Sequence, residues 1–378
     1  MRKISWCLLT ENPDSQSGTK VNGFTYGSGG PTIGLSRSAL YFGGTSGGVI
    51  KTSGQQVVVS VQGSGSVTWT VAASSFIQVS PTSGTGAGAF TVSIKSGTST
   101  SRAGTVTVTA PAAVNSPQSV GVTYTVYSGA TVGSFGYIDS PVDGVTGVVG
   151  AVPFTGWALD DIEVQRVEVW RDPFGAEPPT NPNGFVYVGV ATLVSGQRPD
   201  VEAAYPTYPY AYRAAWGYSL LSNLLPSGGN GVYRLRAYAY DVEGHQTNLG
   251  SRSFTAANAT ATKPFGTIDT PGQGATISGA GYVSWGWALT PQAGMIPLDG
   301  STVTVYIDGQ PVGQASYGYA RSDIDTLFPG LQNTGQGVGY YVIDTTALAN
   351  GIHTIVWGVS DNLGRAEGLG SRYFWVLN

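Results

Sequence analysis

An internal repeat in the C-terminal two thirds of the chain constrains the fold more than any other feature of the sequence. Seven blocks of residues recur in the same order, at a shift that is constant at first and shrinks where the loops differ in length. The clearest pairs are FGYIDSP and FGTIDTP (135–141 and 265–271), GWAL and GWAL (156–159 and 286–289), and GSRSF and GSRYF (250–254 and 370–374). Such recurrence is typical of duplicated units, so residues 133–256 and 263–378 are predicted to be two copies of one domain.

Both copies consist of short runs in which apolar and polar residues alternate, such as VYRLRAYAY (232–240) and TVTVYIDG (302–309). A period of two, between turns rich in Gly, Pro, Asn and Asp, predicts antiparallel strands with one buried face. About seven such strands per copy is the pattern of an immunoglobulin-like sandwich, in which two sheets pack face to face. No stretch has the period of a sustained helix.

The segment before the repeats, residues 35–128, shows the same alternation in VTWTV (67–71) and GTVTVTA (104–110), with more Val, Thr and Ser. It is predicted to be a third sandwich of a different subtype. The linkers, 127–133 and 258–264, are only a few residues long, which limits the reach between domains. The predicted fold class is therefore all-β, with three tandem immunoglobulin-like β-sandwich domains in an elongated, end-to-end array.

Composition excludes several classes of function. Charged residues make up 11% of the chain, less than half of the roughly 25% in an ordinary soluble domain. The net charge is -4 with only five lysines, so nucleic acid is not an expected partner. One cysteine and two histidines provide neither a disulfide framework nor a His/Cys zinc site, and no run of about 20 apolar residues could span a membrane. No nucleophile elbow or phosphate loop is present, so the chain is expected not to be an enzyme.

Residues 1–34 are predicted to form an N-terminal tail. They begin with a basic pair, as a secretory signal does, but no A-x-A-like cleavage site follows, so no clear signal peptide is identified. The apolar residues Ile4, Trp6, Leu8 and Leu9 suit a strand that docks on another sheet. The alternative is a frayed terminus or a misplaced start codon.

Charged residues that recur in both copies are candidates for structural ion pairs, because charge is scarce in this chain. They are Arg198 and Arg321, Asp200 and Asp323, Asp139 and Asp269, and Arg252 and Arg372. Repeated Arg and Asp suggest bidentate pairs that tie loops to sheet ends. The alternative is calcium held by carboxylates at domain junctions, near the turns of Asp139, Asp241 and Asp361, but no D-x-D-x-D loop is present. No metal or other cofactor is assigned.

The stretch YPTYPYAYRAAWGY (205–218) is the most unusual segment of the chain. Matching Gly217-Tyr218 with Gly339-Tyr340 leaves aromatic residues that the second copy lacks, since it has GLQNTGQGV there. These additions are Tyr208, Tyr210, Tyr212 and Trp216. Rigid amphipathic rings on a loop favour a contact surface, for sugar rings or another protein chain. The alternative is a loop that folds back on its own sandwich or on the adjacent domain.

Two parts of the chain resemble known families. Residues 69–108, WTVAASSFIQVSPTSGTGAGAFTVSIKSGTSTSRAGTVTV, resemble the BACON-type Ig-like domain of bacterial secreted proteins. Phe76 stands where a second tryptophan is usual, which weakens a sugar-binding role for that domain. The two copies look like bacterial Ig-like (Big-type) repeats, with IDTP (268–271), VYIDG (305–309), NGIHT (350–354) and DNLG (361–364) in the second copy.

These resemblances imply a bacterial extracellular or cell-surface setting and are nearly silent on activity, because fold alone does not imply function. The predicted function is that of a non-catalytic structural or adhesive protein. One alternative is a self-assembling filament subunit, in which the N-terminal segment adds a strand to a neighbour. The other is a carbohydrate-binding array, for which the aromatic loop is the only specific feature.

Overall fold

The computed structural model describes residues 10–11, 17–18, 30–49, 51–63, 65–129 and 131–378. The tail residues Ile4, Trp6, Leu8 and Leu9 lie outside the described residues, so strand docking by them stays a prediction. Two short strands of the tail, β1 (Thr10–Glu11) and β2 (Ser17–Gly18), pair antiparallel. No helix of the described residues is long and apolar enough to cross a membrane.

The first sandwich, called sandwich 1 below, is formed by strands β3 to β11. One sheet has the order β3 (Thr32–Leu35), β5 (Gln55–Gln62), β9 (Gly88–Ile94), β7 (Ile77–Ser80). The other has the order β4 (Ala39–Thr45), β11 (Gln118–Tyr127), β10 (Arg102–Thr109), β6 (Thr68–Ala73), β8 (Ser83–Thr85). Alternation positions the core as expected, because Val106 and Val108 of β10 are fully buried, whereas the threonines beside them are exposed or half-buried.

Sandwich 2 comprises the strands of the first repeat. One sheet contains β12 (Phe135–Ser140), β14 (Ala151–Leu159), β17 (Ala215–Leu221) and β16 (Val186–Val194). The other contains β15 (Val164–Arg171), β18 (Asn230–Asp241), β19 (Gln246–Ala257) and β13 (Val145–Val148). Because β16 pairs with both β17 and β15, it joins the two sheets into one eight-stranded order.

Sandwich 3 comprises the strands of the second repeat. Its sheets are β20 (Phe265–Ile268), β22 (Tyr282–Leu289), β26 (Val338–Ile343) and β25 (Ser316–Tyr319), and β21 (Ala275–Ile277), β28 (Ala366–Val376), β27 (Gly351–Ser360), β23 (Val303–Ile307) and β24 (Gln310–Gln314). The strand that is continuous as β16 in sandwich 2 is here divided into β24 and β25, one in each sheet.

Helices are short and lie in the connections. They are α1 (Pro199–Ala204), α2 (Pro226–Gly229) and α3 (Ser322–Leu327), and the 3-10 turns η1 (Ala211–Arg213), η2 (Ser222–Leu224), η3 (Asn258–Thr260), η4 (Thr334–Gln336) and η5 (Thr345–Ala347). Helices α1 and α3 occupy matching places in the two repeats. The all-β, immunoglobulin-like fold class is confirmed. The division into domains at the stated residues stays a prediction.

Each repeat core contains one large tryptophan lying over the glycine of its GWAL block. In sandwich 2 a Cβ on Gly156 would lie 2.5 Å from the Trp216 ring, and in sandwich 3 a Cβ on Gly286 would lie 3.2 Å from the Trp357 ring. Both indoles are 1% exposed. The glycine that recurs in the two copies therefore leaves room for a packed ring in both.

The two tryptophans come from opposite sheets, β17 in sandwich 2 and β27 in sandwich 3. Trp216 pairs with the GWAL glycine of its sheet, and the residue in that position of sandwich 3 is Gly339. The place of Trp357 is taken in sandwich 2 by Ala237. Each core thus combines one tryptophan with one small residue, and the copies align one position away from the expected match of Gly217 with Gly339.

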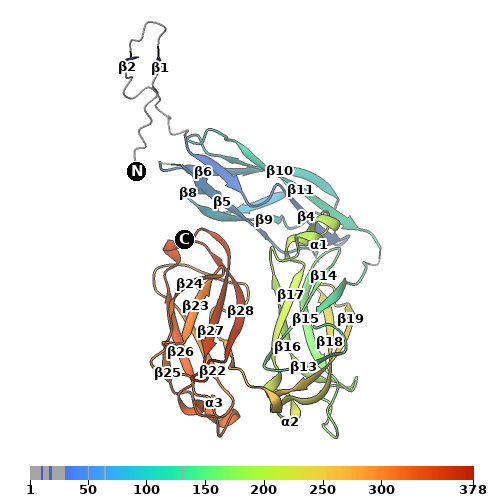
Figure 1. Cartoon of the computed structure of the whole chain (residues 1–378). Coiled ribbons are helices and arrows are strands. Elements are labelled where there is room, and N and C mark those ends of the chain that lie inside the picture. Colours follow the sequence, from blue (N-terminus) through green and yellow to red (C-terminus); the bar gives the residue numbers. More distant parts are fainter. Residues whose placement is uncertain (1–9, 12–16, 19–29, 50, 64, 130) are drawn as a thin grey trace.

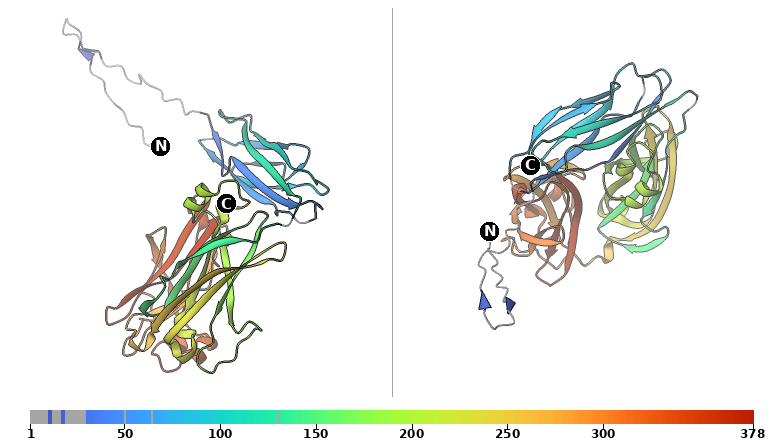
Figure 2. Two further views of the ribbon diagram at one scale, coloured as in Figure 1. Left: turned by 90° about the vertical axis from the view of Figure 1, so that its right-hand side faces the viewer. Right: turned by 90° about the horizontal axis from the view of Figure 1, so that it is seen from above.

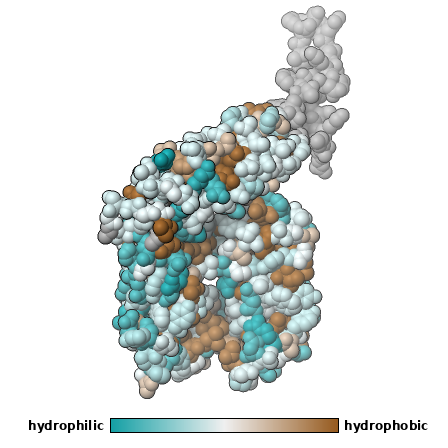
Figure 3. All heavy atoms as spheres, turned by 180° about the vertical axis from the view of Figure 1, so that it is seen from behind, coloured by the Kyte–Doolittle hydropathy of each residue, from teal (hydrophilic) through white to brown (hydrophobic). Residues whose placement is uncertain are grey.

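The end-to-end order of the domains is the part of the prediction that the structure does not follow. Sandwiches 2 and 3 lie side by side, and sandwich 1 lies across one end of the pair (Figures 1 and 2). The space-filling view shows a hollow in the surface between sandwiches 2 and 3 (Figure 3). The fold-back is stabilised by apolar burial, because Leu221 of sandwich 2 shares a cluster with Phe265 and Trp287 of sandwich 3.

Candidate functional site

The aromatic segment 205–218 lies at the end of sandwich 2 that faces sandwich 1, between α1 and β17. Tyr208 packs edge-on against Phe135 and Tyr205 of its own sandwich, and it lines a cavity whose other side is formed by sandwich 1. Tyr210 begins the turn η1 with φ 55° and ψ 25°, a left-handed conformation that is unusual for a residue with a side chain. This turn directs the next part of the segment toward sandwich 1.

Tyr210 is the centre of the contact between sandwiches 1 and 2. Its side chain is 9% exposed, and its hydroxyl lies 2.8 Å from both the Ser53 hydroxyl and the Gly54 carbonyl oxygen. The guanidinium of Arg213 lies 3.7 Å from the centre of its ring. Burial raises the pKa of Tyr210, so the phenol stays protonated and able to donate.

Tyr212 makes the second aromatic contact across this junction. Its ring packs against the core of sandwich 1, and the guanidinium of Arg37 lies 3.7 Å from the ring centre. Arg37 also donates from Nη1 to Glu202 Oε1 of α1 at 2.7 Å. One arginine of sandwich 1 therefore binds both a ring and a carboxylate of sandwich 2.

Glu163 links the same surfaces through buried polar contacts. Its carboxylate accepts from the Ser53 backbone at 2.7 Å, from the Ser53 hydroxyl at 2.9 Å and from Arg213 Nη2 at 3.0 Å. Glu163 is 7% exposed. Beside it, the Thr52 hydroxyl donates to the Ile162 carbonyl at 2.7 Å. A buried carboxylate with three donors stabilises one relative position of the two sandwiches and disfavours others.

The predicted contact residues therefore divide into three groups. Tyr210 and Tyr212 contact a neighbouring domain, which is the arrangement of the alternative in which the loop folds back on the adjacent domain. Tyr208 is half-buried in its own sandwich. The prediction that Trp216 contacts a ligand was wrong, because this residue is 1% exposed in the core of sandwich 2.

The predicted ion pairs form at matching places in the two repeats. Arg198 binds Asp139 and, at 2.7 Å, Asp200. In sandwich 3, Arg321 binds Asp269 at 2.5 Å and Asp323 at 2.8 Å. Both arginines join the start of a short helix to the end of the opening strand. The hydrogen bond from Arg198 lowers the pKa of Asp200 to about 2.

Arg252 and Arg372 differ from the prediction, because their hydrogen bonds go to backbone or hydroxyl oxygens. Arg252 Nη2 donates to the Ile138 carbonyl, and Arg372 Nη2 donates to the Ile268 carbonyl at 3.0 Å. Among the described residues neither guanidinium forms a salt bridge. Their role as ion-pair members is corrected to that of backbone donors, which satisfy carbonyls at the end of the opening strand.

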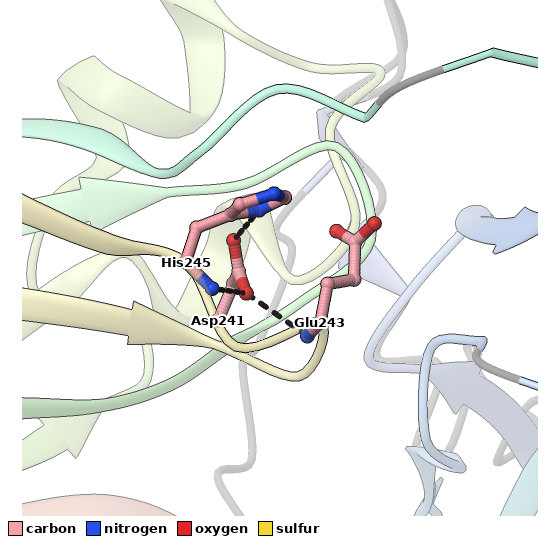
Figure 4. Close-up of side chains that lie close together, drawn as sticks. All are labelled: Asp241, Glu243 and His245. Atoms are coloured by element: carbon pink, nitrogen blue, oxygen red, sulfur yellow. Dashed lines mark hydrogen bonds and ion pairs between the residues drawn. The ribbon is translucent and has the colours of Figure 1, made fainter.

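A group of carboxylates lies at the same end of sandwich 2, near the linker to sandwich 1. Asp241 accepts from the backbone of Glu243 and His245, each at 2.9 Å, and from the His245 ring at 2.7 Å (Figure 4). The carboxylate of Glu243 lies near those of Asp160 and Asp161, with one oxygen of each within 4.8 Å of the others. Burial raises the pKa of Asp160 to about 6, and burial also raises the pKa of Asp161 and Glu243.

Among the described residues, these acidic side chains and His245 form two groups of three whose ligand atoms are close enough to hold one metal ion. Each set of three supplies three ligand atoms, whereas calcium takes six to eight oxygens. Of the aspartates named for calcium in the sequence, Asp139 is bound to Arg198, and Asp361 is bound to Arg365 and Thr290. Only Asp241 belongs to the group near the linker.

No protein-family model matches the chain, and no curated protein matches its sequence. Among solved structures, the fibronectin(III)-like modules of Clostridium thermocellum CbhA are 15% identical, with 64% of this chain and 93% of that chain covered and a TM-score of 0.20. Dimeric latent PorU from Porphyromonas gingivalis is 12% identical, with 92% and 34% covered and a TM-score of 0.33. A bacterial ice-binding adhesin is 13% identical, with 92% and 97% covered and a TM-score of 0.18.

The residues that build the junction on the side of sandwich 1 were missed in the sequence. Arg37, Thr52 and Ser53 lie in connections between the strands of sandwich 1, and Glu163, which directly precedes β15 on the side of sandwich 2, was missed as well. Their partners are more than 100 residues away in the chain. The one signal was the surplus of rings between Tyr205 and Tyr218, which marks one half of the contact.

Proposed function

We propose that this chain is a non-catalytic extracellular structural or adhesive protein, whose three sandwiches act as one folded-back unit. The observation that carries the proposal is the hydrogen-bonded contact of two buried side chains of sandwich 2, Tyr210 and Glu163, with Ser53 of sandwich 1. Inter-domain surfaces held only by a flexible linker move freely, whereas buried, hydrogen-bonded surfaces restrict that motion. A protein that keeps its shape in this way suits the presentation of a surface in a fixed orientation.

The resemblance of residues 69–108 to BACON-type domains, and of the two copies to Big-type repeats, supports a bacterial secreted or surface location for this proposal. A non-catalytic role is supported by the bonding of the two histidines. His245 binds Asp241 across a tight turn, and His353 binds Asp308 at 2.6 Å. Both rings are held by neighbouring carboxylates in positions that stabilise turns.

Small-angle X-ray scattering of the purified chain tests the folded-back unit. A fully compact chain of this length has a radius of gyration of about 21 Å, and the described arrangement is expected to lie slightly above that value. An end-to-end rod would give a pair-distance distribution with a long tail, and that result would reject the rigid folded-back unit.

Self-assembly by strand addition is the alternative that the tail suggests. Electron microscopy of the purified protein with and without residues 1–30 tests it. Filaments that require this segment would support the filament role, and monomers in both samples would reject it. A carbohydrate-binding role through the aromatic loop has less support, since Tyr210 and Tyr212 already contact sandwich 1.

A further inference from the structure

A cleft of about 340 Å³ lies where the three sandwiches meet. Sandwich 1 contributes Arg37, sandwich 2 contributes Tyr212 and Arg213, and sandwich 3 contributes Trp375. This volume is within the range of sites that bind small molecules, roughly 300–1,000 Å³. Because all three sandwiches line it, the cleft exists only in the folded-back arrangement.

The two arginines of the cleft are held in place and still have free donors. The guanidinium of Arg37 lies 3.7 Å from the Tyr212 ring centre and uses Nη1 for Glu202. The guanidinium of Arg213 lies 3.7 Å from the Tyr210 ring centre and uses Nη2 for Glu163. The other nitrogens of both groups have no hydrogen-bond partner among the described residues. A guanidinium that is stacked and anchored at one nitrogen is preorganised to bind an acceptor with the rest.

The cleft offers cationic donors, each from an arginine that is paired on one side with a glutamate. Its described lining includes two arginines, and none of its lining residues is acidic. Glu202 and Glu163 bind the arginines from outside this lining. A lining that offers cationic donors without carboxylates favours a ligand with an anionic group, and a guanidinium matches the geometry of a carboxylate.

Trp375 provides an aromatic wall. Its neighbours on β28, Phe374 and Val376, are 0% and 2% exposed in the core of sandwich 3, so the alternating strand turns Trp375 outward. The indole is half-buried, and its N–H has no partner among the described residues. An indole offers a flat apolar face and a polar edge, which suits a ring that carries hydroxyl groups.

We propose that this cleft binds an acidic saccharide, with a ring carboxylate held by the guanidinium groups and the sugar face packed on Trp375. The inference deepens the adhesive role proposed above and rests on it. The two are separable by experiment, because a compact scattering profile without binding rejects the saccharide site alone. An extended profile removes the folded-back unit and the cleft together.

Isothermal titration calorimetry with tri-galacturonate, and with its neutral methyl ester, tests the proposal. The acid is expected to bind, and the ester to bind roughly tenfold more weakly, because the ester lacks the charge that the arginines recognise. Trp375→Ala is expected to weaken binding of the acid by roughly fivefold to tenfold. Its matched control is Trp285→Ala, which removes another outward-facing indole, 41% exposed on β22, and is expected to leave affinity unchanged.

Arg213→Lys keeps the charge and removes the fork, and it is expected to weaken binding of the acid but not of the ester. This variant carries the test if Trp375→Ala fails to fold. The proposal would be overturned by no binding of the acid at millimolar concentration, by equal binding of acid and ester, or by equal effects of Trp375→Ala and Trp285→Ala. Benzoate that binds as tightly as the saccharide would also overturn it, since recognition would then need only a carboxylate and a ring.

Discussion

The Tyr210 hydroxyl donates to the backbone oxygen of Gly54 at 2.8 Å, and this hydrogen bond joins sandwich 2 to sandwich 1. The two residues are 156 positions apart in the chain. Beside them, the buried Glu163 carboxylate accepts from the Ser53 hydroxyl and from Arg213 Nη2. Substitutions in these contacts are therefore expected to change the stability and the arrangement of the sandwiches.

Tyr210→Phe removes the hydroxyl and keeps the ring. We expect the free energy of unfolding to fall by about 1 kcal/mol, because the Gly54 carbonyl loses its donor in a partly buried contact. Urea unfolding followed by tryptophan fluorescence measures the change. Tyr187→Phe is the control, since that residue is 45% exposed and its hydroxyl has no partner among the described residues. Equal effects of the two substitutions would show that the junction hydrogen bond contributes nothing.

A double-mutant cycle of Ser53→Ala and Glu163→Gln tests the polar part of the junction. The Ser53 hydroxyl and the Glu163 carboxylate are 2.9 Å apart. We expect a coupling free energy of about 1 kcal/mol or more between them, because hydrogen bonds to a charged acceptor are stronger than neutral ones. Unfolding free energies of the two single variants and the double variant give the coupling. Strict additivity would contradict a direct contact in solution.

Gly43→Ala tests how closely the backbones of the two sandwiches approach. A Cβ at Gly43 would lie 2.1 Å from the backbone oxygen of Asp161, so the contact surface must open to admit it. We expect a destabilisation of roughly 1–3 kcal/mol, as for other overpacked sites, and a larger radius of gyration in X-ray scattering. Gly47→Ala is the control, because no atom lies within 4 Å of the added Cβ. An unchanged scattering profile for Gly43→Ala would mean that the surfaces are already apart.

Asp160→Asn tests the carboxylates near the linker. The folded-state pKa of Asp160 is raised from 3.8 to about 6, so between these values the folded protein holds the proton more tightly than the unfolded chain. Acidification through pH 6 therefore increases the stability contributed by this group, and raising the pH removes it. The Asn variant cannot ionise, so its melting temperature should exceed that of the wild type at pH 7.5, and the gap should close near pH 4.

The amide of this variant can still accept from the Ile162 and Glu163 backbones, as the carboxylate does at 2.8 and 2.9 Å. Asp325→Asn, at an exposed site, serves as the matched control and should not change the pH profile. A variant at position 160 that is less stable than the wild type at pH 7.5 would contradict the raised pKa. Addition of calcium chloride at pH 7.5 is an informative extension, because a bound cation would reverse the order of the two proteins.

Much of the local structure could be predicted because the side-chain period of a strand is short. In β18 the alternation of VYRLRAYAY positions Tyr233, Leu235, Ala237 and Ala239 in the core. The ion pair of Arg198 and Asp200 was recognised because both residues recur in the second copy of a chain with little charge. The prediction for Trp216 was wrong because it depended on how the two copies align. Whether a ring on a strand faces the core or a loop depends on a register that shifts by one position between the copies.

The sequence by itself determined the strands, the duplication and the scarcity of charge, since each is carried by the order and composition of residues and needs no knowledge of which surfaces meet in space. Only the tertiary structure decided that the sandwiches fold back and that Tyr210 and Tyr212 contact sandwich 1. It also decided that the tryptophan of each repeat core comes from an opposite sheet. These outcomes depend on which surfaces become buried against each other. The contacts between those surfaces join residues more than 100 positions apart in the chain.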